Sequence, residues 1–200
     1  MWAKVESGSV TELITRPKAM TIGDIQYPRN IFNLWSNTEL KAIGIYPVVM
    51  DYTNRKDQGY YANTAITYTV VGNEVKGAYG TATALALTDV LFSAQDETDG
   101  LGTEGELKQT GLKTRSKGNI NNNAASLLAK HDWMSIREAE GGTAMPSNIK
   151  TWRASVRTKA NSMCTQIDNA SDVDALAALY VYNSDDPPVR PLGEFPDEPS

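Results

Sequence analysis

The sequence predicts an α+β protein in which small antiparallel strands come first and helices follow. Residues 1 to 92 contain short β-rich runs separated by turn dipeptides, which predicts a domain of hairpins. Residues 118 to 182 carry apolar side chains at helical spacing, which predicts a helical hairpin or bundle. Between them, residues 93 to 117 are acidic and glycine-rich, so we expect a linker or an extended loop. Residues 183 to 200 are acidic and proline-rich, so we expect an extended tail without regular structure.

Glycine-containing turns divide the first part into hairpins. They lie at Ser7–Ser9, Gly23–Asp24 and Gly72–Asn73, each between two β-rich runs. Glycine supplies the positive φ that tight hairpin turns require. The run "IYPVVMDY" is a further strand candidate, and Pro47 places it near a sheet edge because proline cannot donate to a ladder.

A short helix is expected after Ser36. Ser36 and Glu39 have the spacing of a capping box, and Gly44 is placed to end the helix.

The strongest periodic signal predicts a long helix after Pro146, with Ser147 as its N-cap. Its apolar residues recur every three or four positions: Ile149, Trp152, Val156, Ala160, Met163 and Ile167. An earlier helix is expected over 118–131, and a last short one with Ser171 as its cap.

Two tryptophans flank the turn between the longer helices. If these helices form a hairpin, Trp133 and Trp152 can pack against each other and fix the turn. His131 and Asp132 are adjacent on a helix and point about 100° apart, so they are poorly placed to act as a base and its partner. We therefore interpret this corner as structural.

No catalytic or cofactor-binding motif is recognised, and we expect neither an enzyme nor a bound cofactor or metal. The chain has one histidine and one cysteine, Cys164, which excludes a thiolate zinc cluster and a disulfide framework. The acidic residues between 96 and 106 lack the alternate spacing of a calcium loop. The cations Lys150, Arg153, Arg157 and Lys159 are expected mostly on the solvated face of the long helix.

The bulk composition limits the classes of partner. Hydrophobic residues make up 40% and charged residues 22%, which suits a packed soluble protein, and the net charge of −5 lacks the basic excess of a nucleic-acid binder. No apolar run approaches the length of a membrane span, and the start of the sequence does not read as a signal peptide. We expect no nucleic acid and no membrane as partners.

The tail contributes most of the negative charge. This segment contains five acidic residues and a single cation, Arg190. The acidic residues are Asp185, Asp186, Glu194, Asp197 and Glu198. Pro187 and Pro188 exclude regular structure. We expect either a free tail or an extended arm docked on a partner, so its deletion should leave the fold intact.

Two stretches resemble a known group of proteins. The start, "MWAKVESGSVTELITRPKAMTIGDIQYPRNIFNLWSNTELKAIGIYPVV", resembles the N-terminal segment of tail-fibre-type structural proteins of tailed marine bacteriophages. The stretch "LLAKHDWMSIREAEGGTAMPSNIKTWRASVRTKANSM" is similar to a helical module of the same proteins and of fibre-assembly proteins. The positions that carry this likeness are Leu127, Leu128, Asp132, Trp133, Trp152, Arg153 and Arg157.

The resemblance implies a structural virion protein that contacts other tail, baseplate or fibre proteins in several copies, after assembly in the host cytoplasm. A first alternative is a fibre-assembly chaperone that is absent from the mature particle. A second is a glycan-binding fibre component, for which the aromatic candidates are Tyr46, Tyr52, Tyr60, Tyr61, Tyr68 and Tyr79.

Overall fold

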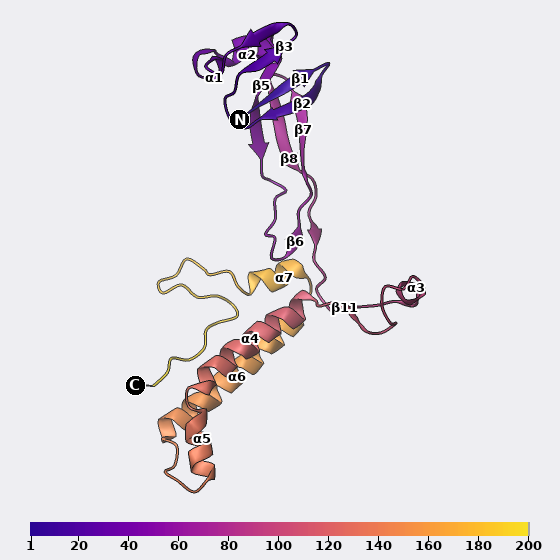
Figure 1. The fold of residues 1–200 in the computed structure, drawn as a ribbon. Helices are drawn as coiled ribbons and strands as arrows, with labels where there is room; N and C mark the ends of the chain where they lie inside the picture. The colour runs from indigo at the N-terminus through magenta and orange to yellow at the C-terminus, as the bar shows by residue number, and fades with distance from the viewer. Residues whose placement is uncertain (200) are drawn as a thin grey trace. The chain divides into compact units, whose positions relative to one another are not determined.

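The computed structural model describes residues 1–199, and its strands and helices confirm the α+β class. The chain divides into two compact units, Met1–Thr83 and the residues from Ala84 onward (Figure 1). This division lies before the boundary expected at residue 92. The units are described separately below.

The first unit contains a curled five-stranded sheet (Figure 1). Its strand order is β2-β1-β5-β8-β7, and every neighbouring pair is antiparallel except β5 with β8. The edge strands β2 and β7 approach each other. This reduces the free edge that the sheet offers to another chain. The strand bounds are β1 Trp2–Glu6, β2 Ser9–Ile14, β5 Ile45–Asp51, β7 Ile66–Val71 and β8 Glu74–Tyr79.

All three expected hairpin turns are present. Strands β3 (Met20–Ile22) and β4 (Ile25–Tyr27) pair across Gly23, whose φ of 58° is one that glycine adopts without strain. The remaining strands of this part, β6 (Tyr61–Ala62) and β9 (Thr83–Ala84), form a separate two-stranded pair.

The expectation that Pro47 marks an edge strand is wrong, because β5 is the central strand. Val48 donates its N–H to Met1 O on the β1 side, so the nitrogen of Pro47 faces the opposite side. The ladder with β8 begins only at Val48, which pairs with Val75. The missing N–H therefore falls just outside that ladder.

The core of the first unit lies between the sheet and two short helices, α1 (Ile31–Leu34) and α2 (Asn37–Ala42). Ser36 and Glu39 form the expected capping box, with Ser36 N–H to Glu39 Oε2 at 2.7 Å. The buried cluster joins β2, both helices and β5 through Ile14, Ile31, Phe32, Leu40 and Ile45.

In the second unit, the segment expected to be a linker is ordered. Strands β10 (Val90–Leu91) and β11 (Leu107–Gln109) pair on either side of helix α3 (Ala94–Thr98). Ser93 and Asp96 form a second capping box, and Lys108 pairs with Asp96. Lys108, and after it Ser93, lower the pKa of Asp96 to about 2. Local polar contacts thus order a segment whose composition alone predicts a loop.

Helix α4 (Leu112–Ala129) begins at Leu112 rather than at residue 118. Its first N–H groups, from Leu112 and Lys113, bond to the carbonyls of Ala86 and Leu87. A side chain at Gly111 would collide with the backbone of Thr88, so only glycine allows this approach. These partners lie far back in the sequence, which is why no local capping signal marks the true start.

Helices α4 and α6 (Ser147–Asn169) lie side by side as the expected hairpin, with α5 (Asp132–Ala139) at the turn (Figure 1). The six apolar residues predicted to form the stripe of α6 are all buried. Two expected caps shift by one residue: Pro146 occupies the N-cap of α6, and Asp172, rather than Ser171, caps α7 (Val173–Ala178). No helix in residues 1–199 is both long and apolar enough to cross a membrane.

Candidate functional site

Arg153 joins the two helices at the corner of the hairpin. Its guanidinium Nη1 donates to the carbonyl of Leu128 in the last turn of α4, and Nη2 donates to Asp132 Oδ1 at 2.7 Å. A cation at the C-terminus of one helix and an acid at the N-terminus of the next both suit the helix dipoles. Arg153 is only 8% exposed and is the exception among the cations expected mostly on the solvated face, whereas Arg157 is exposed as expected.

The expected packing of Trp133 against Trp152 is also wrong. Trp152 is 5% exposed and its ring meets His131 edge-on, with centroids 5.6 Å apart. Trp133 is 53% exposed and lies under the guanidinium of Arg137. Histidine, and not a second tryptophan, therefore packs against the buried indole.

His131 and Asp132 have different partners, as expected from their adjacent positions on a helix. The Nε2 atom of His131 lies 2.7 Å from Glu198 Oε1, and Lys130 Nζ lies 2.7 Å from Glu198 Oε2. Lys130, and after it His131, lower the pKa of Glu198 below its ordinary value. Within the described chain, the buried Nδ1 of His131 has no hydrogen-bond partner, so Glu198 is the polar partner of the ring.

The C-terminal segment is docked on its own unit, which corrects the expectation of a free or partner-docked tail. Leu192 is fully buried and donates its N–H to the carbonyl of Leu179 at 3.0 Å. The indole N–H of Trp152 donates to the carbonyl of Pro196 at 3.0 Å. We call residues 190–199 the C-terminal arm.

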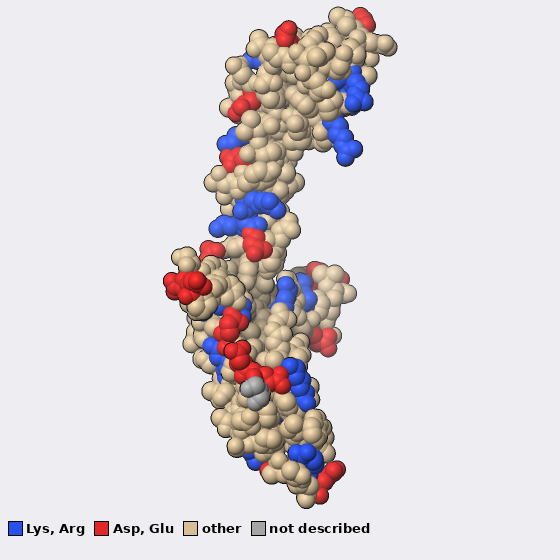
Figure 2. All heavy atoms as spheres, turned by 90° about the vertical axis from the view of Figure 1, so that its left-hand side faces the viewer, with Lys and Arg blue, Asp and Glu red and all other residues tan. Residues whose placement is uncertain are grey.

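Pro187 and Pro188 lie before the arm, in an exposed loop over residues 183–189. Asn183 closes this loop by accepting the N–H of Val189 and that of Asp185 at its side-chain oxygen. Figure 2 shows the row of acidic side chains that follows the C-terminal segment over the surface of this unit.

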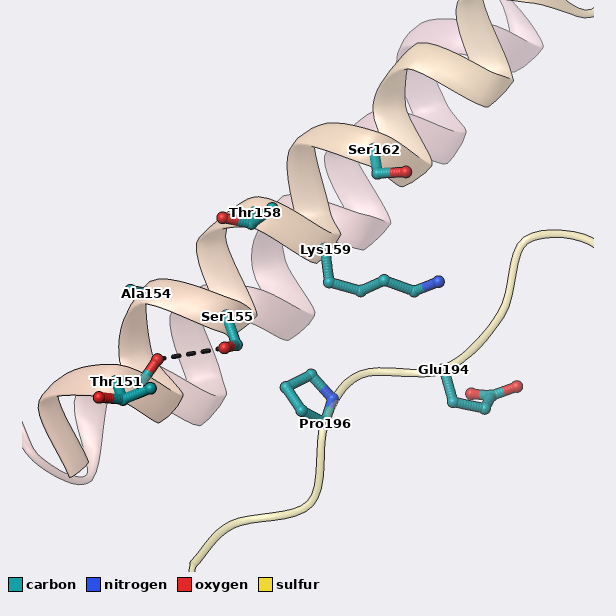
Figure 3. A pocket seen from close by; sticks show the side chains of 8 residues that line it. All are labelled: Thr151, Ala154, Ser155, Thr158, Lys159, Ser162, Glu194 and Pro196. Carbon is teal, nitrogen blue, oxygen red and sulfur yellow. Dashed lines mark hydrogen bonds between the residues drawn. The ribbon is translucent and has the colours of Figure 1, made fainter. Parts of the chain in front are cut away.

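A groove of about 570 Å³ separates the arm from α6 (Figure 3). The α6 wall carries short side chains and one cation, and the arm supplies an acid and a proline: Thr151, Ala154, Ser155, Thr158, Lys159, Ser162, Glu194 and Pro196. A second hollow, of about 560 Å³, lies between the arm and α4. The arm thus crosses the α4–α6 hairpin with open space on both sides.

Helix α5 is positioned by polar contacts and buries none of its side chains. Glu138 pairs with Lys150 at 3.1 Å and accepts the N–H of Met145, and Arg137 donates to the carbonyl of Thr143 at 2.9 Å. Trp133 and Ile136, one turn apart, are 53% and 59% exposed. The helix therefore presents two large apolar side chains to solvent.

Other candidate chemistry does not assemble into a site in residues 1–199. No group of three potential metal ligands forms among these residues. Burial raises the pKa of the Cys164 thiol, which disfavours the nucleophilic thiolate. The cations of α6 also separate, because Arg153 is enclosed by the corner and Lys150 pairs with Glu138.

The tyrosines of the first unit fall into different settings. Lys41 lies over the ring of Tyr46, and Tyr52 and Tyr79 have ring centroids 6.3 Å apart. Tyr52 is 55% exposed and carries Arg55 on its ring. Three of the candidate rings, Tyr46, Tyr52 and Tyr61, each have a cation over them.

Comparison of the chain with protein-family models, with curated proteins and with solved structures found no significant match.

The sequence identifies Asp132 and Arg153, which the corner brings together, but misses the arm residues that complete the site. Leu192, Pro196 and Glu198 bond to Leu179, Trp152 and Lys130 from a segment that we expected to be free or docked on a partner. The sequence feature that could have indicated a docked arm is the "LGEF" run, which places Leu192 and Phe195 in a mostly polar tail.

Proposed function

We propose that this chain is a structural protein of a tailed bacteriophage particle and acts through contacts with other tail, baseplate or fibre proteins. The observation that carries the proposal is helix α5, on which Trp133 and Ile136 are exposed while polar contacts fix the helix in place. Exposed tryptophan on a fixed helix is typical of protein-binding surfaces, where aromatic residues contribute much of the affinity. The resemblance to tail-fibre-type proteins supplies the biological setting.

The proposed role requires no chemical turnover. Arg153 bonds to Leu128 and Asp132, and His131 bonds to Glu198 of the arm. This arrangement serves to fix the surface that α5 presents.

The α5 surface can be tested with the double substitution Trp133→Ser and Ile136→Ser. We expect this variant to fold normally, because both side chains are more than half exposed, and to be lost from purified particles. The matched control is Val181→Ser with Val189→Ser, which removes comparable exposed apolar groups elsewhere and should leave incorporation unchanged. Equal incorporation of both variants would refute a contact role for α5.

In the chaperone alternative, the same exposed helix binds fibre proteins during assembly, and the chain is absent from the finished particle. A mass-spectrometric inventory of purified particles separates the two proposals, since a chaperone is missing from the finished particle. For the glycan-binding alternative, loss of glycan-array binding on Tyr60→Ala or Tyr61→Ala is the discriminating result.

A further inference from the structure

The C-terminal arm lies on the α4–α6 hairpin in the manner of a bound peptide. It contains no helix or strand. Its contacts include a buried side chain, backbone groups and the carboxylates of Glu194 and Glu198. Leu192 is fully buried, the carbonyl of Pro196 accepts the Trp152 indole N–H, and Glu198 pairs with Lys130 and His131. An apolar side chain in a pocket with flanking polar contacts is how extended peptides are commonly recognised.

The surface beneath the arm is complementary to it in charge. Lys130 and His131 face Glu198, and the side chain of Lys159 reaches the backbone of Gly193. Gly193 has a φ of 73°, a backbone conformation that glycine adopts without strain. The site is therefore suited to an acidic, proline-containing segment with leucine before glycine.

The loop before the arm allows the arm in a given site to come from the same chain or from a neighbouring one. Residues 183–189 are all exposed, and Asn183 bonds within the loop to Val189 and Asp185. If this loop opens, seven extended residues span up to about 25 Å, which is long enough to carry the arm to a neighbouring molecule. The contacts of the arm itself would be the same in both arrangements.

We propose that the arm site also accepts the C-terminal arm of a second copy of this chain, so that copies become linked by exchange of their arms. Attachment to its own chain gives each arm a high effective concentration, so the closed form predominates in dilute solution. Exchange becomes important where many copies lie close together. The proposal concerns only the arm and its site and does not depend on a role in a phage particle.

A synthetic peptide tests whether the site accepts an arm from outside. A fluorescein-labelled peptide of residues 189–199 is titrated into full-length protein. The wild-type arm competes with it, whereas Leu192→Ala weakens the attached arm and leaves the site intact. The peptide should therefore bind the Leu192→Ala chain about tenfold more tightly, or better, than wild type.

Controls separate specific docking from non-specific association. A peptide carrying the same Leu192→Ala change should bind neither chain, and Lys130→Ala in the protein should weaken binding by removing a partner of Glu198. If Leu192→Ala does not fold, Glu198→Ala is the milder arm variant, since Glu198 lies at the surface. Equal binding of the intact peptide to wild type and the arm variant, or no binding up to millimolar peptide, would overturn the proposal.

Exchange between whole chains is tested by mixing two complementary variants. The Leu192→Ala chain has an intact site and a weakened arm, whereas the Lys130→Ala chain has an intact arm and a weakened site. Native mass spectrometry should detect heterodimers in the mixture at several times the level of dimers in either variant alone. A mixture that remains as monomeric as its components would contradict exchange even if the peptide binds.

Discussion

Trp152 is the residue that connects the corner of the hairpin to the arm. Its ring packs against His131, its indole N–H bonds to Pro196, and it is almost fully buried. We expect Trp152→Ala to lower the free energy of unfolding of the second unit by about 3–5 kcal/mol, because it leaves a large cavity. Urea denaturation measures this change.

Trp133→Ala is the matched control, because this tryptophan is 53% exposed. It should change the unfolding free energy by less than about 0.5 kcal/mol. Similar losses at both positions would mean that Trp133 also belongs to the core.

Glu198 makes the docking of the arm pH-dependent. Lys130, and after it His131, lower the pKa of this carboxyl in the docked arm. Its contribution is therefore complete above the ordinary pKa of glutamate and is lost as the pH falls through the lowered value. We expect the protection of the Trp152 indole N–H from hydrogen exchange, relative to a free indole at the same pH, to fall on acidification in wild type, and this dependence to be weaker in Glu198→Gln.

Asp197→Asn makes the same charge change one residue away, outside the contact with Lys130 and His131. It should retain the wild-type pH profile. If both variants lose the dependence equally, net charge on the arm accounts for it, and the specific pairing does not.

For single residues, the sequence predicts which side chains are buried better than it predicts which groups they contact. The periodicity of α6 correctly buries Trp152 but gives no indication of what contacts its indole N–H. Arg153 is misassigned because its position next to the apolar stripe is equally compatible with solvent and with the end of α4. A partner distant in the sequence decides between these settings, and helical spacing contains no information about it.

Among the elements, the C-terminal arm differs most from what the sequence predicts, because it contributes to the stability of the second unit. Leu192 is fully buried, so Leu192→Ala should destabilise the second unit by about 2–5 kcal/mol. Val189→Ala, at a position that is 52% exposed in the preceding loop, should have almost no effect. Thermal denaturation of the two variants measures the difference, and equal melting temperatures would show that the arm is not part of the folded unit.

Elements with complete local signals are predicted well. The Ser36 capping box, the glycine turn between β3 and β4 and the stripe of α6 depend on residues within a few positions of one another. The start of α4, the central place of β5 and the docking of the arm depend on distant contacts instead. Proline content correctly predicts that the arm lacks regular structure, but irregular backbone can still be packed.

At the scale of the whole molecule, the two units have separate cores. Leu40 is buried in the first unit and Met163 in the second. We expect Leu40→Ala to lower the stability of the first unit by about 2–5 kcal/mol without changing the second, and Met163→Ala to do the reverse. Hydrogen exchange measured by mass spectrometry reports each unit separately, and a parallel loss of protection in both would indicate a single cooperative fold.

The proposal that α5 presents a surface to another protein of the particle can be tested directly by site-specific cross-linking. A photo-reactive amino acid replaces Ile136, and irradiated, purified phage particles are analysed by mass spectrometry. The account predicts a covalent adduct between position 136 and a different virion protein. Absence of the chain from the particles, or adducts only within the same chain, would contradict it.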